Sequence, residues 1–307
     1  MDLTIPGSSQ KYLADLDRTQ SQLTKAQAQI SSGLRLQNVS DDPSAIAQIY
    51  HLQAAIATNK QTQANLAGAT SEVSAADVAL QSAVQTVESA ISLAAQGANS
   101  TQTAQDRANL AQQVSGLLQA LVSISQTRVN GRYIFSGDQD TQPAYHLDAT
   151  QPNGVKQLLT AGSTLVISDS NGAPISIART AQEIFDARDA NGDSASSNIF
   201  AAVNSLLRGL QNNDQTAISN AASALNSAND YLNGQLAFYG DAETRLTAAS
   251  DLAQKFLTGQ QASLGQVQDA DVPAAALALT QATTQLQAAL SVEAKIQQQP
   301  NLFSYLA

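Results

Sequence analysis

The sequence predicts a mainly α-helical protein, in which the two ends of the chain form a long coiled-coil or bundled rod. A small β-rich (α+β) inserted domain is expected at the distal end of that rod. Helical apolar spacing at both ends and strand and turn signals between them predict this class. The composition agrees, because 43% of the 307 residues are hydrophobic but only 4% are aromatic. Much of the apolar content is alanine, which suits long, thinly packed helices.

The first segment carries a heptad pattern. Leu16, Leu23 and Ile30 recur every seven residues, and Leu13 and Leu34 belong to a companion row that two glutamines interrupt. Such rows predict a helix that packs against a partner as in a coiled coil.

The stretch ISSGLRLQNVSDDPSAIAQI predicts a joint between two helices. Gly33 is a natural stop, Asp42 a natural N-cap, and Pro43 suits the first helical position. Asp41 is favourable at the positive end of the same helix. The acidic pair has no second pair beside it, so capping explains it better than acid–base catalysis.

Four further helices are expected before the last one, at about residues 43–97, 103–127, 199–211 and 214–268. Three of them carry rows with seven-residue spacing, which predict core seams between the long helices. These rows are Val73, Leu80 and Val87; Leu110, Leu117 and Ile124; and Leu225, Leu232, Tyr239 and Leu246.

Strand signals lie in the middle of the chain. The segment GRYIFSG is short, aromatic and bounded by glycines, and prolines 143, 152 and 174 argue against helix. The clearest signal is a pair of apolar runs around Asn171-Gly172, which predicts a hairpin.

A last helix is expected after the sequence DADVP, running to about residue 299. Its apolar positions include Leu279, Leu286, Leu290 and Ile296. Neither terminal helix has enough large apolar groups to be stable alone, so the two are expected to pair. The tail after them is a candidate docking sequence. Its large apolar residues are Leu302, Phe303, Tyr305 and Leu306.

Five divisions of the chain follow from these patterns. They are an N-terminal arm at 1–38, the first part of the helical bundle at 39–136, the β-rich inserted domain at 137–198, the second part of the bundle at 199–268, and a C-terminal arm at 269–307.

Composition argues against several classes of function. The net charge is −10 and no long basic cluster exists, so nucleic acid and anionic membranes lack an electrostatic partner. The chain has no cysteine, which removes thiol catalysis and disulfides. No apolar run is long enough for a membrane span. The N-terminus lacks the pattern of a cleaved secretory signal, so the protein is expected to be cytosolic or to leave by a signal-independent route.

Catalytic and metal motifs are weak. His51 and His146 are the two histidines, and neither accompanies a serine in a nucleophile frame. Asp189, Asn191 and Asp193 have the spacing of the first calcium-loop ligands, but the following glycine and the final acid are missing. A solvated loop is therefore expected there, and no catalytic residue, metal site or cofactor is predicted.

At the level of whole motifs, the chain resembles the bacterial flagellin family. The segment QISSGLRLQNVSDDPSAIAQI is similar to the family's N-terminal joint, and NGRYIFSG to the end of its first helical block in the members that join hook and filament. DAD, LTQATTQLQAAL and NLFSYL are similar to the C-terminal arm. The resemblance covers about residues 1–145 and 240–307. Pro43, where filament flagellins usually have alanine, favours the junction members.

The resemblance implies a structural protein of the bacterial flagellum that is exported unfolded by the flagellar type III secretion system. Its implied partners are neighbouring copies of itself in a ring, the first hook-associated protein on the hook side and flagellin on the filament side. A cytosolic export chaperone is implied at the C-terminal arm. The terminal arms would form an inner coiled-coil tube, in which the apolar rows of the first and last helices are the assembly interface between neighbouring subunits. Arg35, Asp41 and Asp42 at the joint would add contacts to those subunits.

Two other hypotheses remain open from the sequence. A short filament flagellin would share the same motifs but would polymerise alone. An enzyme housed in the inserted domain would need a pocket with convergent polar groups.

Overall fold

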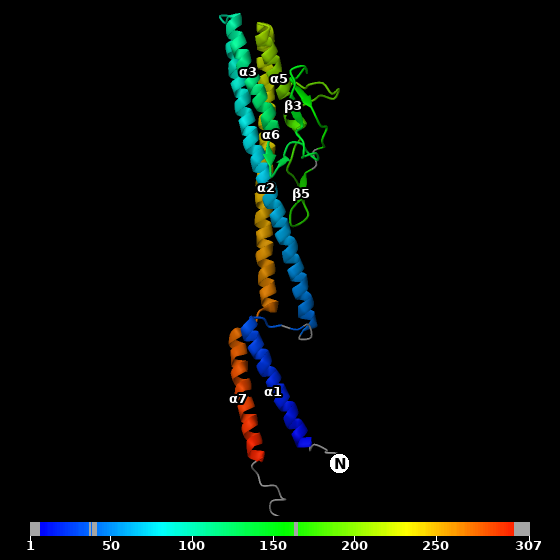
Figure 1. Ribbon diagram of the computed structural model, residues 1–307, viewed down its shortest axis with the longest axis vertical. Coiled ribbons are helices and arrows are strands. Elements are labelled where there is room, and N and C mark those ends of the chain that lie inside the picture. The colour runs from blue at the N-terminus through cyan, green and yellow to red at the C-terminus, as the bar shows by residue number, and fades with distance from the viewer. Residues whose placement is uncertain (1–6, 37, 39–41, 163–164, 298–307) are drawn as a thin grey trace, which may run out of the picture. The chain divides into compact units, whose positions relative to one another are not determined.

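The computed structural model describes residues 7–36, 38, 42–162 and 165–297 (Figure 1). It confirms a mainly α-helical fold with a small sheet-containing region. The described residues divide into two compact units. The first unit takes residues from Met1–Thr58 and Phe256–Ala307, and the second is Asn59–Lys255.

Four long helices build the second unit among the described residues: α3 and α5 lie wholly within it, and α2 and α6 each contribute the part that belongs to it. Their bounds are α2 (Pro43–Gly97), α3 (Ala104–Ser125), α5 (Ile199–Gln211) and α6 (Gln215–Gln268). The predicted helices are thereby confirmed to within about two residues. None of the helices among the described residues is long and apolar enough to cross a membrane.

The predicted seams of α2 and α6 form the core of this unit, whereas on α3 Leu117 and Ile124 of the predicted row are only partly buried against it. Val73, Leu80 and Val87 on α2 are fully buried, as are Leu225 and Leu246 on α6. Between these large residues the buried positions are mostly alanines. They are Ala69, Ala76, Ala83 and Ala90 on α2, and Ala221, Ala228, Ala242 and Ala249 on α6. Small side chains at alternate seam positions let the long helices approach closely, so a chain poor in aromatic residues can still fill its core.

The end of α2 is held by a buried arginine. Arg107 donates from Nε to the carbonyl of Gly97 at 2.8 Å and from a terminal nitrogen to the carbonyl of Asn99 at 3.2 Å. A guanidinium at a helix C-terminus satisfies carbonyls that have no partner within the helix and complements the helix dipole. Helix α3 begins just before it, with a capping box between Thr103 and Asp106.

Among the residues that the structure describes, six short strands form three separate antiparallel pairs. They are β1 (Arg128–Val129) with β2 (Arg132–Tyr133), β3 (Tyr145–Leu147) with β4 (Val155–Gln157), and β5 (Val166–Ser168) with β6 (Pro174–Ser176). The last pair is the hairpin predicted around Asn171-Gly172 and is confirmed. Gly172 has a positive φ of 83°, and Asp169 Oδ1 accepts hydrogen bonds from the Asn171 and Ala173 amides.

The β-containing segment shares one hydrophobic core with the helices. Phe135, Phe185 and Tyr239 meet edge to face, with Phe135 5.9 Å and 6.5 Å from the two other ring centroids. Phe185 stacks on Phe200 of α5 at 5.7 Å. A short helix, α4 (Ala181–Phe185), presents Phe185 to this cluster. Aromatic pairs of this kind add to the stabilisation that area burial provides.

The first unit is built on the two terminal helices, α1 (Gly7–Ser32) and α7 (Val272–Gln297), which pack against each other. Their antiparallel pairing confirms the pairing of arms expected from the heptads (Figure 1). A small cluster of Leu36, Ala45 and Ile49, with Leu264 and Val267 beside it, completes this unit.

Candidate functional site: the terminal helix pair and its joint

The joint begins where α1 ends. Gly33 has φ +70°, a left-handed conformation that glycine adopts without a steric penalty. The chain then runs antiparallel to the segment that leaves α6. Leu34 pairs with Asp269, the Arg35 amide donates to the Gln268 carbonyl, and the Ala270 amide donates to the Gly33 carbonyl, both at 2.8 Å. The two passages of the chain into the terminal helices are therefore bound to each other.

Arg35 adds a side-chain contact to this crossing. Its Nε and Nη2 donate to the carbonyl of Val267 at 3.2 Å and 2.9 Å. Gln29 in turn donates from its side chain to the Arg35 carbonyl at 3.0 Å. Arg35 thus caps the C-terminal end of α6, a role that suits a cation at a negative helix end. Contacts of Arg35 with neighbouring subunits stay a prediction.

Asp42 starts α2 as the sequence predicts. Its Oδ1 accepts from the Ala45 amide at 3.1 Å and from the Ser44 hydroxyl at 2.7 Å, and Pro43 is the first helical residue. The pKa of Asp42 is lowered, first by the Ser44 hydroxyl, then by the Ala45 amide, and also by the charge of Arg35. Asp41 lies outside the described residues. The capping geometry accounts for Asp42 without acid–base chemistry.

A second aspartate caps the other terminal helix. Asp271 Oδ1 accepts from the Ala274 amide at 3.0 Å at the start of α7. In the segment DAD, Asp269 therefore belongs to the crossing and Asp271 to the cap.

The predicted assembly residues on α1 and α7 differ in exposure. Leu16, Leu23, Ile30, Leu34, Leu279 and Leu286 are half-buried. Leu13 is 54% exposed and Leu290 is 51% exposed. The side chain of Ile296 and the residues Leu302, Phe303, Tyr305 and Leu306 lie outside the described residues.

The innermost contacts of the pair come from alanines, which the sequence reading missed. Ala26 on α1 and Ala275 and Ala282 on α7 are at most 5% exposed. The seven-residue spacing of the last two is a signal that could have revealed them. The buried positions of the pair are therefore occupied by small side chains. The larger apolar side chains, such as Leu13 and Leu290, keep much of their surface exposed.

One polar side chain, that of Tyr12, forms hydrogen bonds between α1 and α7. The hydroxyl of Tyr12 donates to the Ala289 carbonyl at 2.9 Å and lies 3.2 Å from a carboxylate oxygen of Glu293. Partial burial, followed by the hydrogen bond and charge of Glu293, raises the pKa of Tyr12.

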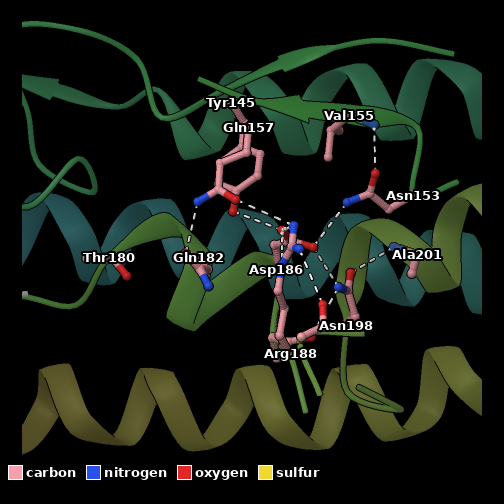
Figure 2. Close-up of polar contacts among 12 residues, drawn as sticks. Tyr145, Asn153, Val155, Gln157, Thr180, Gln182, Asp186, Arg188, Asn198 and Ala201 are labelled. Carbon is pink, nitrogen blue, oxygen red and sulfur yellow. Dashed lines mark hydrogen bonds and ion pairs between the residues drawn. The ribbon is translucent and has the colours of Figure 1, made fainter. Parts of the chain in front are cut away.

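In the second unit, a buried carboxylate organises the β-containing segment (Figure 2). Asp186 is fully buried. It accepts from the Tyr145 hydroxyl at 2.9 Å, from the Asn153 and Asn198 side-chain amides at 3.1 Å and 2.7 Å, and from Nη2 of Arg188 at 2.7 Å. Burial, with Asp186 beside it, raises the pKa of Tyr145 well above its ordinary value. The hydrogen bonds that Asp186 accepts join separate parts of the β-containing segment, so the role of this carboxylate is structural.

The candidates for chemistry in this segment do not assemble into a site. A hollow of about 450 Å³ lies beside the Asp186 network, and Lys156, Arg188 and Asp193 line it without a histidine. His146 is exposed and lies against the carbonyl of Leu147 at 2.7 Å. Asp189 Oδ1 accepts the amides of Asn191 and Asp193 instead of facing a metal position. In the described part of this segment, these contacts place no base next to a nucleophile.

Comparison with known proteins places these features in a family context. Residues 7–140 match the family model described as the bacterial flagellin N-terminal helical region. Flagellar hook-associated protein 3 of Escherichia coli is 28% identical over 277 residues, covering 84% of this chain and 83% of that protein. The protein of the same name from Salmonella typhimurium is 27% identical over 270 residues, with the same coverage of each chain.

A solved structure shares the fold. The flagellar hook-associated protein-3 of Legionella pneumophila superimposes with a TM-score of 0.61 at 14% identity, covering 71% of this chain and 98% of that chain. The arrangement of long helices with a small β-containing segment is therefore common to both.

Proposed function

We propose that this chain is the flagellar subunit that joins the hook to the filament, a structural protein of the bacterial flagellin family rather than an enzyme. The observation that carries the proposal is the poor cover of the terminal helices. Leu13 and Leu290 are more than half exposed, and the pair meets mainly through alanines.

Assembly would bury these leucines against neighbouring copies. Each Å² of apolar surface removed from water contributes about 25 cal/mol, so burial of these side chains at every subunit contact would favour association. The first unit carries seven of the twelve large hydrophobic residues that are exposed among those described, although it is the smaller unit. Exposed apolar groups gathered on one part of a molecule indicate an interaction surface.

In the proposed assembly, copies form a ring whose terminal helices make an inner coiled-coil layer. The five-part division of the chain belongs to this proposal, with the arms at 1–38 and 269–307. The ring would contact the first hook-associated protein on one side and flagellin on the other. Export would proceed through the flagellar type III secretion system, with a cytosolic chaperone on the C-terminal arm.

A double variant tests the proposal directly. Leu13→Gln with Leu290→Gln should leave the helical content of the purified protein unchanged, because both side chains are exposed. Cells that produce only this variant should carry hooks without filaments in electron micrographs. The matched control is Val78→Gln, an exposed apolar residue of the second unit, which should leave filaments attached. Normal filaments in the double variant, or in a chain lacking residues 1–38 and 270–307, would refute the proposal.

A short filament flagellin is the competing function, since the matched family model is described as the bacterial flagellin N-terminal helical region. The purified chain would then extend seeded filaments by itself. A junction subunit should not do so, and electron microscopy of seeded samples separates the two.

A further inference from the structure

The pair of terminal helices has two unlike flanks. On one flank α1 and α7 form an open groove of about 290 Å³. Its lining includes Gln22, Lys25 and Gln29 from α1, and Gln281 and Gln285 from α7, together with alanines. We call it the glutamine groove. Its walls are the aliphatic stems and amides of glutamine, and its one charged lining residue is Lys25.

The opposite flank carries the two exposed leucines. Leu13 precedes Gln22 by nine residues, and Leu290 follows Gln281 by nine residues. Nine residues are about two and a half helical turns, which places each leucine on the side of its helix opposite the groove. Because Tyr12 bonds to Ala289, the residues that follow these two, Leu13 and Leu290, lie at the same level of the antiparallel pair. We call this side the leucine flank.

The two flanks match in register and in charge. A shift of nine residues along the pair, about 14 Å, brings Leu13 level with Gln22 and Leu290 level with Gln281. Asp17 lies one turn beyond Leu13 on the same side of α1, and the same shift brings it level with Ala26, next to Lys25. One displacement therefore sets both leucines against the groove and an aspartate beside its lysine.

We propose that the leucine flank of one copy docks in the glutamine groove of the next copy, displaced by about 14 Å along the helix pair. This inference rests on the proposed function and specifies which surfaces meet. Each copy then offers one flank and one groove, so the contact is heterologous and adds copies in one direction, as a ring or helical layer requires. Apolar leucines against alanines and glutamine stems lose water on both sides, and glutamine amides remain at the rim.

Disulfide cross-linking tests the proposal cleanly, because the chain has no cysteine of its own. Two full-length variants, Leu13→Cys and Gln22→Cys, carry tags of different size and are produced together in the source bacterium without its own copy. Flagella are sheared, oxidised and separated on a non-reducing gel. The expected product is a dimer of the two tags, absent when either variant is produced alone. A chain with both cysteines should give a ladder. Ala14→Cys, exposed next to Leu13 on α1, replaces Leu13→Cys as the matched control and should give much less dimer.

The other outcomes overturn the docking geometry without touching the proposed function. A dimer formed by Leu13→Cys alone would mean that the leucine flank meets its own copy. Filaments attached to hooks with no cross-link in any combination would mean that flank and groove do not meet. Failure of the proposed function appears separately, as attached filaments when the terminal arms are deleted.

Discussion

Tyr12 and Ala289, 277 positions apart in sequence, are joined by a hydrogen bond of 2.9 Å from the tyrosine hydroxyl to the main-chain carbonyl. The pair also packs through alanines and half-buried leucines, and main-chain hydrogen bonds at the joint tie the end of α1 to the start of α7. The tyrosine bond adds a register contact at the other end of the pair, where the exposed leucines lie.

Tyr12→Phe tests this role. The ring stays, but the Ala289 carbonyl and the Glu293 carboxylate both lose the hydroxyl. Amide hydrogen exchange should become faster throughout α1 and α7, while the helices of the second unit keep their protection. Tyr50→Phe is the matched control, since Tyr50 is 63% exposed and should change nothing. Unchanged exchange in α1 and α7 would show that other contacts set the register.

The stability of the terminal pair should also depend on pH above neutrality. The pKa of Tyr12 is raised, so the folded pair holds this proton more tightly than the unfolded chain does. Stabilisation is then complete below the ordinary tyrosine pKa of about 10 and is lost as the pH rises above it. In the natural chain, the amide hydrogen-exchange rates of α1 and α7, corrected for the intrinsic rate, should therefore rise above this pH. In Tyr12→Phe this added dependence should disappear.

Gly33→Ala should weaken the joint through backbone strain alone. Gly33 has φ +70°, and a Cβ there meets nothing within 4 Å. The expected loss is about 1–2 kcal/mol, the penalty of a left-handed non-glycine residue. Gly68→Ala is the matched control, because Gly68 is helical with open space around it and should gain up to about 1 kcal/mol. Urea unfolding monitored on each unit measures both changes, and a neutral Gly33→Ala would contradict the strain argument.

Long-range helical order could be predicted because its signals repeat. The rows through Leu80 and Leu232 obey a spacing that has few alternatives, and their burial follows. The hairpin at Gly172 could also be predicted, because the residues that favour its turn are adjacent in the sequence. The β1–β2 hairpin carries the same signal, Asn130-Gly131 with positive φ at both residues, but its strands have only two residues each.

The contacts that hold the β-containing segment could not be predicted in the same way. Tyr145, Asn153, Asp186 and Asn198 come from separate turns, strands and caps, and no periodicity relates them. The alanine contacts of the terminal pair were hidden for a different reason. Alanine is abundant along the whole chain, so the seven-residue spacing of Ala275 and Ala282 is a weak signal against that background, and the partner helix is what buries them.

Asp186→Asn should therefore destabilise the second unit strongly. The natural carboxylate accepts on both oxygens, Oδ1 from two asparagine side chains and Oδ2 from Tyr145 and Arg188. An amide keeps the size but turns one acceptor into a donor and leaves the guanidinium without its counter-charge. The Arg188 side chain is 36% exposed, so the expected loss lies below the about 3–5 kcal/mol that removal of one partner costs in a fully buried ion pair. Urea unfolding followed by near-ultraviolet circular dichroism measures the loss through the buried tyrosines.

Asp189→Asn separates this network from a general effect of charge. Asp189 is exposed and accepts only from amides of its own turn, a role that asparagine can also fill. Its unfolding midpoint should stay within the error of the natural chain. If Asp186→Asn were equally neutral, the four donors would not depend on a charged acceptor, and the aromatic cluster of Phe135, Phe185 and Phe200 alone would hold the β-containing segment on the helices.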